Sequence, residues 1–472
     1  MQNKRDLIVI GGGAGGLVIA SVASQLGLNV TLIEKQAKLG GDCLHHGCVP
    51  SKALIKAAKV AHLMRRAGEF GLPSQSFPID LGKVNQQVNS IVDHIQQHDD
   101  PERFRAYGCE VLLGEPARFI SPHAVQVGER VIEGRRFVIA TGSRPFIPAI
   151  PGINPDDLLT NESLFDLQQL PASLAVLGGG PIGLELGQAM SRLGSQVTLL
   201  QRGPRLLAHE DTELVDLLQK QLTDEGLQIQ TNSDIERIEH QNDQYEIIDN
   251  NHDRVRVDKI LVATGRRPNI EGLDPERAGI ETTPRGIMVD RRLRTSQKHI
   301  YACGDVAGPY AFTHQAEYQA GLIISNAVFR FPKKADYRIL PWVTYTDPEL
   351  AQVGLTEQQA REQGIKHTVL RFDFKEVDRA LTERETAGRV KLVTRKGKIL
   401  GASILGPQAG ELIHELVLAM QSGAKIGDIS AAIHAYPTLA QIHRRTVNTA
   451  YAAKLFSPLT RRLVRWLQRL PG

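Results

Sequence analysis

An internal repeat constrains the fold of this chain more than any other feature. Thirty residues from Asp6 align without a gap with thirty residues from Ser173, at an offset of 167 positions. In each copy an apolar stretch, a Gly-x-Gly-x-x-Gly turn, a helical pattern and a second apolar stretch follow one another. The glycines are Gly11, Gly13 and Gly16 in the first copy and Gly178, Gly180 and Gly183 in the second. The repeat therefore predicts two strand–turn–helix–strand units, each part of a parallel sheet.

This glycine spacing is typical of dinucleotide-binding turns. The first glycine makes a tight turn, the second lets the pyrophosphate approach the backbone, and the third lets helix and strand pack closely. The N-terminus of the helix then binds the phosphates. One such motif is weak evidence, but two in register predict two dinucleotide sites.

A second, shorter repeat supports this interpretation. Residues 138–142, Val-Ile-Ala-Thr-Gly, match residues 261–265, Leu-Val-Ala-Thr-Gly. Each segment indicates a buried strand that ends in a tight turn. Thr141, Gly142 and Gly265 are therefore candidate cofactor-binding residues.

The two dinucleotide sites are expected to differ in the ribose they bind. Glu34 ends the first copy, where an acid is placed to bind a ribose hydroxyl. The second copy has Gln201 at that place, followed by Arg202 and Arg205. Loss of the acid and gain of two cations favour a 2′-phosphate, hence NADPH. Gly183 is the residue typical of an NADH site, so NADH stays open.

Composition excludes several other classes of protein. The chain has 472 residues, which suggests roughly three domains. Hydrophobic residues make up 42% and charged residues 23%, so a large core can form. Residues 1–23 imitate a signal peptide, but glycines interrupt the apolar run, and we expect a cytoplasmic protein. Four cysteines are too few for a disulfide-stapled scaffold.

The positive charge is concentrated at the C-terminus. The formal net charge is +4, yet the chain from Arg444 onward has seven basic residues and no acid, so the rest is mildly acidic. This distribution argues against nucleic-acid binding. Leu459, Leu463, Trp466, Leu467 and Leu470 share one helical face, with arginines opposite. The tail is thus expected on an anionic membrane, on an acidic partner surface, or as a solvated helix packed on the dimer.

Two nearby cysteines, Cys43 and Cys48, indicate redox or metal chemistry. On a regular helix their Cα atoms would lie roughly 8 to 9 Å apart, too far for a disulfide. A bridge therefore requires a distorted first turn, for which Gly47 gives the freedom. His45 and His46 lie between the cysteines, but this spacing fits no structural zinc pattern, and we expect no resident metal. Transient binding of a soft ion by the reduced cysteines stays open.

These motifs together resemble the pyridine nucleotide-disulfide oxidoreductases, which include glutathione reductase, dihydrolipoamide dehydrogenase and mercuric reductase. The resemblance rests on the two glycine motifs, the cysteine pair followed by Val49-Pro50-Ser51-Lys52, and the segment Tyr301-Ala302-Cys303-Gly304-Asp305. It implies an α/β fold with two Rossmann-like domains, a C-terminal α+β dimerisation domain, bound FAD and a homodimer. The implied segments are an FAD domain at 1–150, an NAD(P)H domain at 151–270, a return to the FAD domain at 271–339, a dimerisation domain at 340–455 and the tail at 456–472.

The same resemblance assigns roles to individual residues. Cys48 would be the flavin-side sulfur and Cys43 the one that attacks substrate. Lys52 and Glu185 match positions that pair near the reactive nitrogen of the flavin. Asp305 matches the acid that binds the ribityl chain of FAD. The flavin-contacting stretch that follows it is Thr313, His314, Gln315 and Ala316.

The chain departs from the disulfide reductases near its C-terminus. Tyr436 stands where the family has its proton-shuttling histidine, and Gln441 stands in place of the orienting glutamate. His434 and His443 lie two residues away, on a different face. A tyrosine here is similar to mercuric reductase, but no cysteine follows Cys303 to receive a metal.

This departure leaves three hypotheses for the function. The first is electron transfer from NADPH through FAD and the dithiol to a thiophilic metal ion or another small acceptor. The second is a disulfide reductase similar to dihydrolipoamide dehydrogenase. The third is an electron donor to a quinone or a membrane partner, or a redox sensor.

Overall fold

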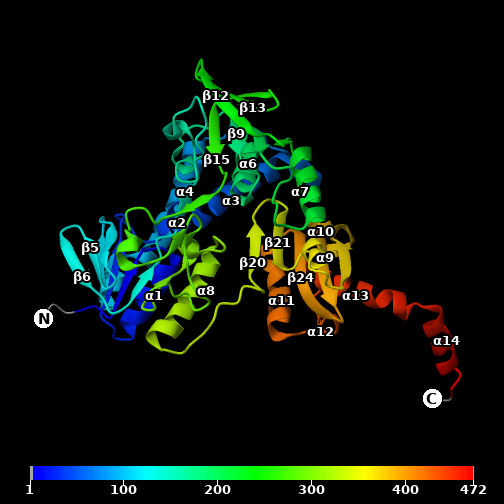
Figure 1. The fold of residues 1–472 in the computed structure, drawn as a ribbon. Coiled ribbons are helices and arrows are strands. Elements are labelled where there is room, and N and C mark those ends of the chain that lie inside the picture. The colour runs from blue at the N-terminus through cyan, green and yellow to red at the C-terminus, as the bar shows by residue number, and fades with distance from the viewer. Residues whose placement is uncertain (1–3, 471–472) are drawn as a thin grey trace. The chain divides into compact units, whose positions relative to one another are not determined.

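The chain folds into two compact units, each assembled from segments that lie far apart in the sequence. The structure is a computed structural model that describes residues 4–470. The first unit contains Met1–Arg202 and Asn232–Asp336, and the second contains Gly203–Thr231 and Tyr337–Gly472. Figure 1 traces the elements in chain order.

The first unit is built on a parallel sheet in the strand order β19-β7-β1-β2-β3. The strands are β1 (Leu7–Ile10), β2 (Val30–Glu34), β3 (Glu110–Leu113), β7 (Phe137–Ile139) and β19 (Ile300–Ala302). Every residue of β1 and β2 is buried, as expected for inner strands of a parallel sheet. Helix α1 (Ala14–Gln25) connects β1 to β2 and packs against α8 (Thr313–Ile323).

The second copy of the repeat forms the same unit again. Strand β9 (Ser173–Leu177) leads into α6 (Pro181–Leu193) and then β10 (Gln196–Gln201). Strand β9 pairs in parallel with β10 on one side and with β15 (Lys259–Val262) on the other. The two predicted strand–helix–strand units are therefore confirmed.

Antiparallel ladders and further helices complete the first unit. Two three-stranded ladders are β4 (Ala117–Ser121), β5 (Ala124–Val127) and β6 (Arg130–Glu133), and β12 (Ile235–Gln241), β13 (Gln244–Asp249) and β14 (Arg254–Val257). Two short pairs are β8 (Ser143–Pro145) with β16 (Arg266–Pro268), and β17 (Thr282–Thr283) with β18 (Gly286–Ile287). The helices are α2 (Gly41–His45), α3 (Cys48–Arg65), α4 (Leu81–Gln96) and α5 (Pro101–Ala106).

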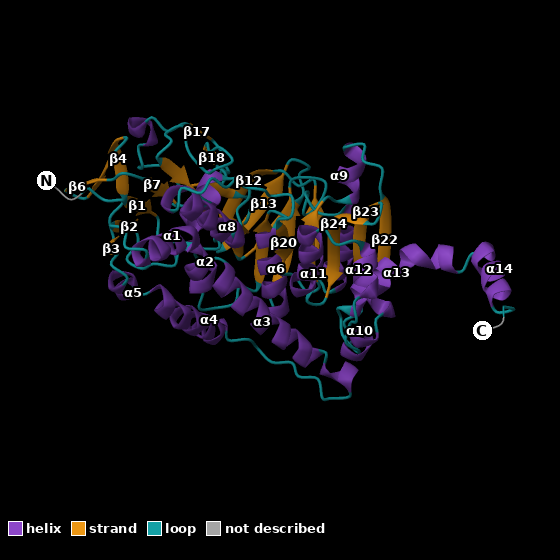
Figure 2. Ribbon diagram, turned by 90° about the horizontal axis from the view of Figure 1, so that it is seen from below, coloured by secondary structure: helices purple, strands orange, loops and turns teal. Residues whose placement is uncertain are grey.

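The second unit is an α+β domain around an antiparallel sheet in the order β20-β21-β24-β23-β22. These strands are β20 (Pro341–Thr344), β21 (Glu349–Gly354), β22 (Thr368–Asp373), β23 (Arg389–Arg395) and β24 (Lys398–Gly406). Helix α11 (Ala409–Ser422) packs on β21 and β24 (Figure 2), and its Ile413 and Leu416 are fully buried. This is the α+β fold expected for the C-terminal part.

The other elements of the second unit lie before, between and after these strands in the sequence. They are α7 (Thr212–Asp224), β11 (Gln228–Thr231), α9 (Glu357–Glu362), α10 (Asp378–Glu383), α12 (Ile426–Ala431), α13 (Gln441–Leu455) and α14 (Pro458–Leu467). Among the helices that the structure describes, none combines the length and apolar character that crossing a bilayer requires. The apolar run at the N-terminus is instead divided between a strand and a helix.

Candidate active site

The first glycine turn joins β1 to α1 and leaves the helix N-terminus uncovered. Gly11 has a φ of +111°, which a residue with a side chain rarely adopts. A Cβ on Gly16 would lie 1.9 Å from the carbonyl oxygen of Gly11, so only glycine permits this packing. Gly13 precedes α1 without a side-chain cap, so its first amide groups remain available to phosphate.

Glu34 and Gln201 make the same hydrogen bond in the two copies of the repeat. Oε2 of the buried Glu34 accepts from the backbone N–H of Gly12 at 2.7 Å. Oε1 of Gln201 accepts from the N–H of Gly179, also at 2.7 Å. The amide therefore keeps the structural bond of the turn while removing its negative charge.

The two arginines that follow Gln201 differ in their surroundings. Arg202 is exposed directly after β10, in the first unit. Arg205 belongs to the second unit, where its Nη2 donates to Asp216 Oδ1 at 2.8 Å and to the carbonyl of Thr212 at 3.1 Å. Arg202 is therefore the stronger candidate for a 2′-phosphate contact, since the charge of Arg205 is already balanced.

Several positions in the first unit fit a bound dinucleotide. A Cβ on Gly142, on Gly180 or on Gly265 would meet no heavy atom within 4 Å, so each leaves its backbone open to a ligand. Gln315 is fully buried, and its Oε1 has no hydrogen-bond partner within the part of the chain that the structure describes. This buried oxygen could accept a hydrogen bond from a ligand that carries a hydrogen-bond donor, such as a flavin.

The two redox-candidate cysteines lie on either side of a break between helices. Cys43 lies within α2, and Cys48 is the first residue of α3. The chain leaves helical geometry at Gly47, with φ −113° and ψ −115°, which is the distortion expected from the sequence. Both cysteines are described as thiols.

The electrostatics of the pair place the negative charge on Cys48. A hydrogen bond from the Cys43 thiol lowers the pKa of Cys48 to about 6, opposed by burial and aided by Thr313 and the charge of Lys52. The Thr313 hydroxyl lies 3.5 Å from the Cys48 sulfur. The pKa of Cys43 is correspondingly raised, first by its hydrogen bond to Cys48 and then by burial. The reduced pair is therefore poised as one thiolate and one thiol near neutral pH.

Lys52 and Glu185 form the pair that the resemblance implied. Lys52 lies one turn after Cys48 on α3, and its Nζ contacts Glu185 Oε2 at 2.8 Å. Glu185 is buried on α6, which packs against α3. The carboxylate thus fixes a cation one helical turn from the cysteine pair.

The guanidinium group of Arg266 connects Asp42, the residue before Cys43, to the surroundings of Asp305. Arg266 Nη2 donates to Asp42 Oδ2 at 2.8 Å, and its Nε donates to the Ser143 hydroxyl at 2.7 Å. The same hydroxyl donates to Asp305 Oδ2 at 2.5 Å. Burial raises the pKa of Asp305. Neither Arg266 nor Asp42 was predicted from the sequence, although Arg266 directly follows the repeated Ala-Thr-Gly turn and Asp42 directly precedes Cys43.

The two histidines between the cysteines make no metal site here. His45 Nε2 lies 2.9 Å from the carbonyl oxygen of Leu39, while His46 is half-buried. Within residues 4–470 no group of three or more histidine, cysteine, aspartate or glutamate side chains is placed to hold a metal ion. Besides this bond of His45, the two rings make a tilted contact with each other, with centroids 6.1 Å apart.

Tyr436 and the neighbouring histidines lie in the second unit. Tyr436 is exposed, whereas the His434 ring turns inward and its Nε2 lies 3.1 Å from Glu415 Oε1. His443 is fully buried, with Nε2 3.0 Å from the carbonyl of Leu412, and burial lowers its pKa. Neither histidine shares the exposed position of Tyr436, in agreement with the expectation that they lie on a different face.

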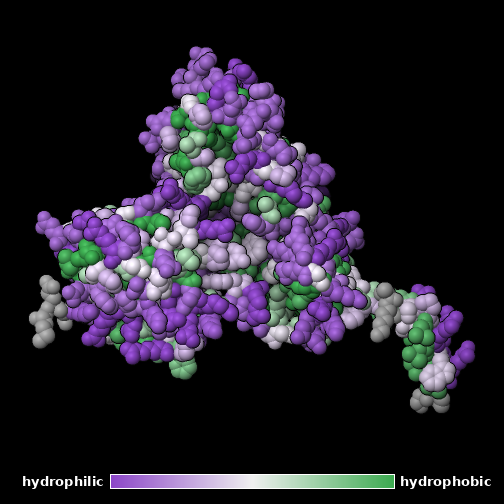
Figure 3. All heavy atoms as spheres, viewed as in Figure 1, coloured by the Kyte–Doolittle hydropathy of each residue, from purple (hydrophilic) through white to green (hydrophobic). Residues whose placement is uncertain are grey.

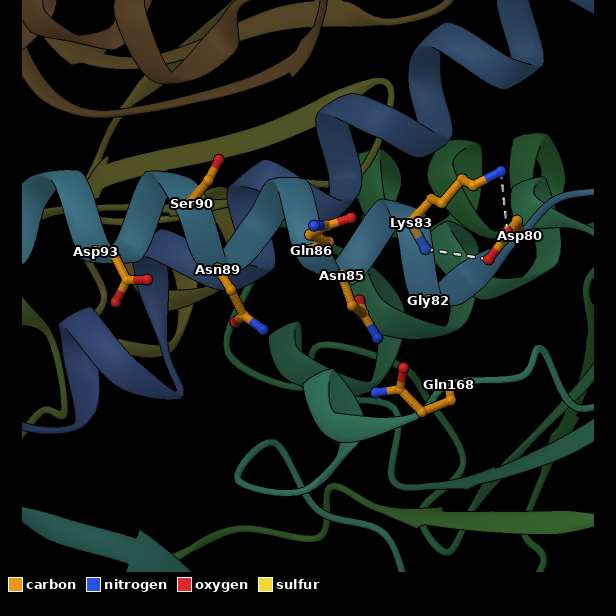
Figure 4. A pocket seen from close by; sticks show the side chains of 9 residues that line it. All are labelled: Asp80, Gly82, Lys83, Asn85, Gln86, Asn89, Ser90, Asp93 and Gln168. Carbon is orange, nitrogen blue, oxygen red and sulfur yellow. Dashed lines mark hydrogen bonds and ion pairs between the residues drawn. The ribbon is translucent and has the colours of Figure 1, made fainter.

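A pocket of about 640 Å³ lies along α4 and contains none of the predicted site residues. Figure 4 shows its lining, in which Asp80, Lys83 and Asn85 come from the start of the helix and Gln168 faces them. The Asp80 carboxylate caps the N-terminus of the helix and contacts Lys83, so it is already used in stabilising the helix. We find no chemistry here that competes with the cysteine pair.

Family models cover almost the whole chain. The pyridine nucleotide-disulphide oxidoreductase model matches residues 5–320, and the dimerisation domain of the same family matches residues 340–446. The chain belongs to this family. Its members are FAD-dependent enzymes that use a pyridine nucleotide, and its dimerisation domain supports a homodimer. The predicted family, fold class and enzyme class are thereby confirmed.

Individual relatives include two enzyme types within this family of oxidoreductases. The chain is 37% identical to a mercuric reductase of Staphylococcus aureus over 444 residues, covering 92% of this chain and 80% of that protein. It is 36% identical to a dihydrolipoyl dehydrogenase of Geobacillus stearothermophilus, covering 95% and 96%. Among solved structures it is similar to the Cu(II) complex of the HOCl-induced flavoprotein disulfide reductase RclA from Escherichia coli, with 29% identity, a TM-score of 0.85, and coverage of 95% and 100%.

Proposed function

We propose that this oxidoreductase passes electrons from NADPH, through FAD and the Cys43–Cys48 dithiol, to a thiophilic metal ion. The observation that carries the proposal is the paired state of the two sulfurs: Cys48 is stabilised as a thiolate by Cys43, Thr313 and Lys52. A thiolate is the form that attacks or ligates such an ion. The contact of Cys48 with Thr313, in the expected flavin-contacting stretch, supports Cys48 as the flavin-side sulfur.

Each group of residues would have a separate role in this electron transfer. Bound FAD would supply two-electron transfer between the nicotinamide and the disulfide. The glycine turns at Gly11 and Gly178 would bind the two pyrophosphates, and Lys52, held by Glu185, would place a positive charge near the flavin. Reduced Cys43 and Cys48 would ligate Hg(II) or Cu(II). Cys43 would release its proton to solvent as its sulfur binds the metal. The two thiolates would then give up two electrons and close to the disulfide, reducing one Hg(II) to Hg(0) or two Cu(II) to Cu(I).

Tyr436 and Gln441 favour a metal acceptor over an organic disulfide. Reduction of a disulfide releases a thiolate that needs a proton, and a positioned general acid contributes typically about 10² to 10⁴-fold. A metal ion needs no proton to accept electrons. A tyrosine hydroxyl is a poorer proton shuttle at neutral pH than an imidazole, but it serves as a hydrogen-bond donor.

The relatives support both possible acceptors. Mercuric reductases and dihydrolipoyl dehydrogenases match over similar lengths, and the similar RclA structure is a Cu(II) complex. The absence of any cysteine after Cys303 means that metal delivery lacks a receiving pair, so we expect a high KM for the metal. Slow turnover is expected with lipoamide or glutathione disulfide.

An acceptor panel with NADPH tests the proposal. Hg(II), Cu(II), lipoamide, glutathione disulfide and a quinone are compared for the wild type and for Cys43→Ser. We expect metal-dependent NADPH oxidation that Cys43→Ser abolishes, together with two new thiols per subunit after reduction. Suppose that Cys43→Ser still reduces the quinone and that the wild type does not reduce the metal ions. This result would instead indicate an electron donor to a quinone or a membrane partner.

The double change Tyr436→His and Gln441→Glu distinguishes a metal reductase from a disulfide reductase. If proton shuttling is what the chain lacks, the double variant gains disulfide reduction and leaves metal reduction unchanged. Lipoamide turnover in the wild type as fast as metal turnover would contradict the proposal.

A further inference from the structure

The last helix of the chain, α14, is formed but covered by nothing in the structure. Ser457 caps it by accepting a hydrogen bond from the Thr460 N–H, and Pro458 occupies its first turn. No residue of α14 is buried, and all residues from 461 to 470 are exposed. A capped helix with no buried face indicates a surface that is completed by something outside the chain.

One face of α14 is apolar. Its side chains follow helical spacing, and they are Leu459, Leu463, Trp466 and Leu467 within the helix and Leu470 directly after it. Leu459 is 77% exposed and Trp466 is 58% exposed. Figure 3 shows apolar surface along one side of this terminal segment and hydrophilic surface along the other. A contiguous exposed stripe of this kind marks an interaction surface.

The opposite face carries only positive charge. Arg461, Arg462, Arg465 and Arg469 lie within an arc of about 100° at a helical repeat of 3.6 residues. No acidic residue follows Arg444 in the sequence, so the arginines have no carboxylate on their own element. The guanidinium groups therefore favour an anionic surface that lies parallel to the helix axis.

We propose that α14 lies in the headgroup region of an anionic lipid bilayer. Leucine and tryptophan side chains would enter the acyl boundary, while the arginines contact phosphate groups at its surface, the arrangement of an interfacial helix. Arg462 lies nearest the apolar stripe by helical angle, and its long stem lets the charge reach the headgroups. A protein groove would bury the leucines equally well, but four unopposed arginines specifically favour a continuous anionic surface.

Vesicle flotation of the full-length, FAD-loaded protein tests this proposal. We expect co-flotation with vesicles of phosphatidylcholine and phosphatidylglycerol, weak binding to pure phosphatidylcholine, and release by salt. Replacing Leu463 and Trp466 by Gln should reduce binding at least about tenfold. Replacing Arg461 and Arg465 by Gln should lower affinity for anionic vesicles about fivefold for each arginine.

A matched control distinguishes membrane binding by α14 from nonspecific binding through exposed leucines. Leu381 on α10 is 53% exposed, close to the 52% of Leu463, so Leu381→Gln removes a comparable exposed leucine outside α14. This control should float like the wild type. Tryptophan emission should shift to shorter wavelength on binding, and Trp466→Phe should remove that shift.

Three results would overturn the proposal. The first is equal flotation of the full chain and of a chain ending at Phe456. The second is equal binding to neutral and anionic vesicles. The third is dissociation of the dimer, measured by light scattering, in the Leu463→Gln and Trp466→Gln double variant, because α14 would then cover the other subunit. NADPH oxidation with a soluble acceptor should stay unchanged in every α14 variant.

Discussion

Cys48 owes its low pKa to neighbours from three separate elements, and each neighbour is open to substitution. The thiolate should dominate above about pH 6, because the pKa of Cys48 is lowered to about 6. Thr313→Val removes a hydroxyl that lies 3.5 Å from the sulfur. We expect the rate of Cys48 alkylation at pH 6 to fall roughly fivefold, corresponding to a pKa higher by about one.

The measurement is the pH profile of iodoacetamide labelling in the reduced protein, followed by peptide mass spectrometry. Thr446→Val offers a control, because Thr446 donates only within its own helix in the second unit. Labelling that is identical in Thr313→Val and the wild type would show that Thr313 does not stabilise the thiolate.

Gln201 offers a test of cofactor choice that leaves the turn intact. Glu34 shows that a carboxylate makes the same 2.7 Å bond to the glycine turn that Gln201 makes. Gln201→Glu should therefore fold normally, yet repel a 2′-phosphate and accept a ribose hydroxyl. We expect the ratio of kcat/KM for NADPH over NADH to fall about tenfold or more.

Arg202→Ala should act in the same direction by raising the KM for NADPH more than the KM for NADH. Steady-state kinetics with both cofactors measure the two effects. An unchanged ratio in both variants would contradict the predicted NADPH site.

Within the strand–turn–helix elements, the second and third glycines serve different purposes. A Cβ on Gly183 would lie 2.0 Å from the carbonyl oxygen of Gly178, whereas a Cβ on Gly180 would meet no heavy atom within 4 Å. Gly183→Ala should therefore destabilise the first unit by about 1 to 3 kcal/mol. Gly180→Ala should fold normally and raise the KM for NADPH, because it fills space needed by the pyrophosphate.

Thermal unfolding and cofactor kinetics on both variants distinguish these roles. The expected pattern is a lower Tm for Gly183→Ala alone and a higher KM for Gly180→Ala. A normal KM in Gly180→Ala would place the pyrophosphate elsewhere.

Across the chain, segments far apart in sequence are joined by a buried charge cluster in the second unit. Lys391 on β23 is 4% exposed, and its Nζ contacts Asp211 at 2.9 Å, Glu213 at 3.0 Å and Glu357 at 2.8 Å. Lys391→Met would remove the cation that contacts the buried Asp211, whereas Glu213 and Glu357 would keep their ion pairs with Arg371. We expect a loss of about 3 to 5 kcal/mol, typical of a broken buried pair.

Lys220 provides the comparison, since its ion pair with Asp224 is exposed on α7. Lys220→Met should change stability by less than about 1 kcal/mol. Urea unfolding of both variants measures the difference. Equal stabilities would show that the cluster around Lys391 does not stabilise the second unit.

Features set by neighbouring residues were predictable from the sequence. The glycine turns, the buried strands and the helix break at Gly47 follow from backbone sterics and hydrophobic periodicity over a few residues. The family, fold and enzyme class followed because these local patterns recur in a fixed order along the chain. The pairing of Lys52 with Glu185 required the resemblance, since nothing local connects two residues on different helices.

Contacts between distant residues were decided only when the chain folded. Thr313 reaches Cys48 across 265 positions, and Arg266 reaches Asp42 across 224. Sequence spacing contains no information on such contacts, because they depend on how strands and helices stack and on side-chain orientation. The bond from Gly179 to Gln201 and the charge cluster around Lys391 belong to the same class. Local sterics thus determined the elements and their order, whereas the packing of those elements determined which charges and thiols meet.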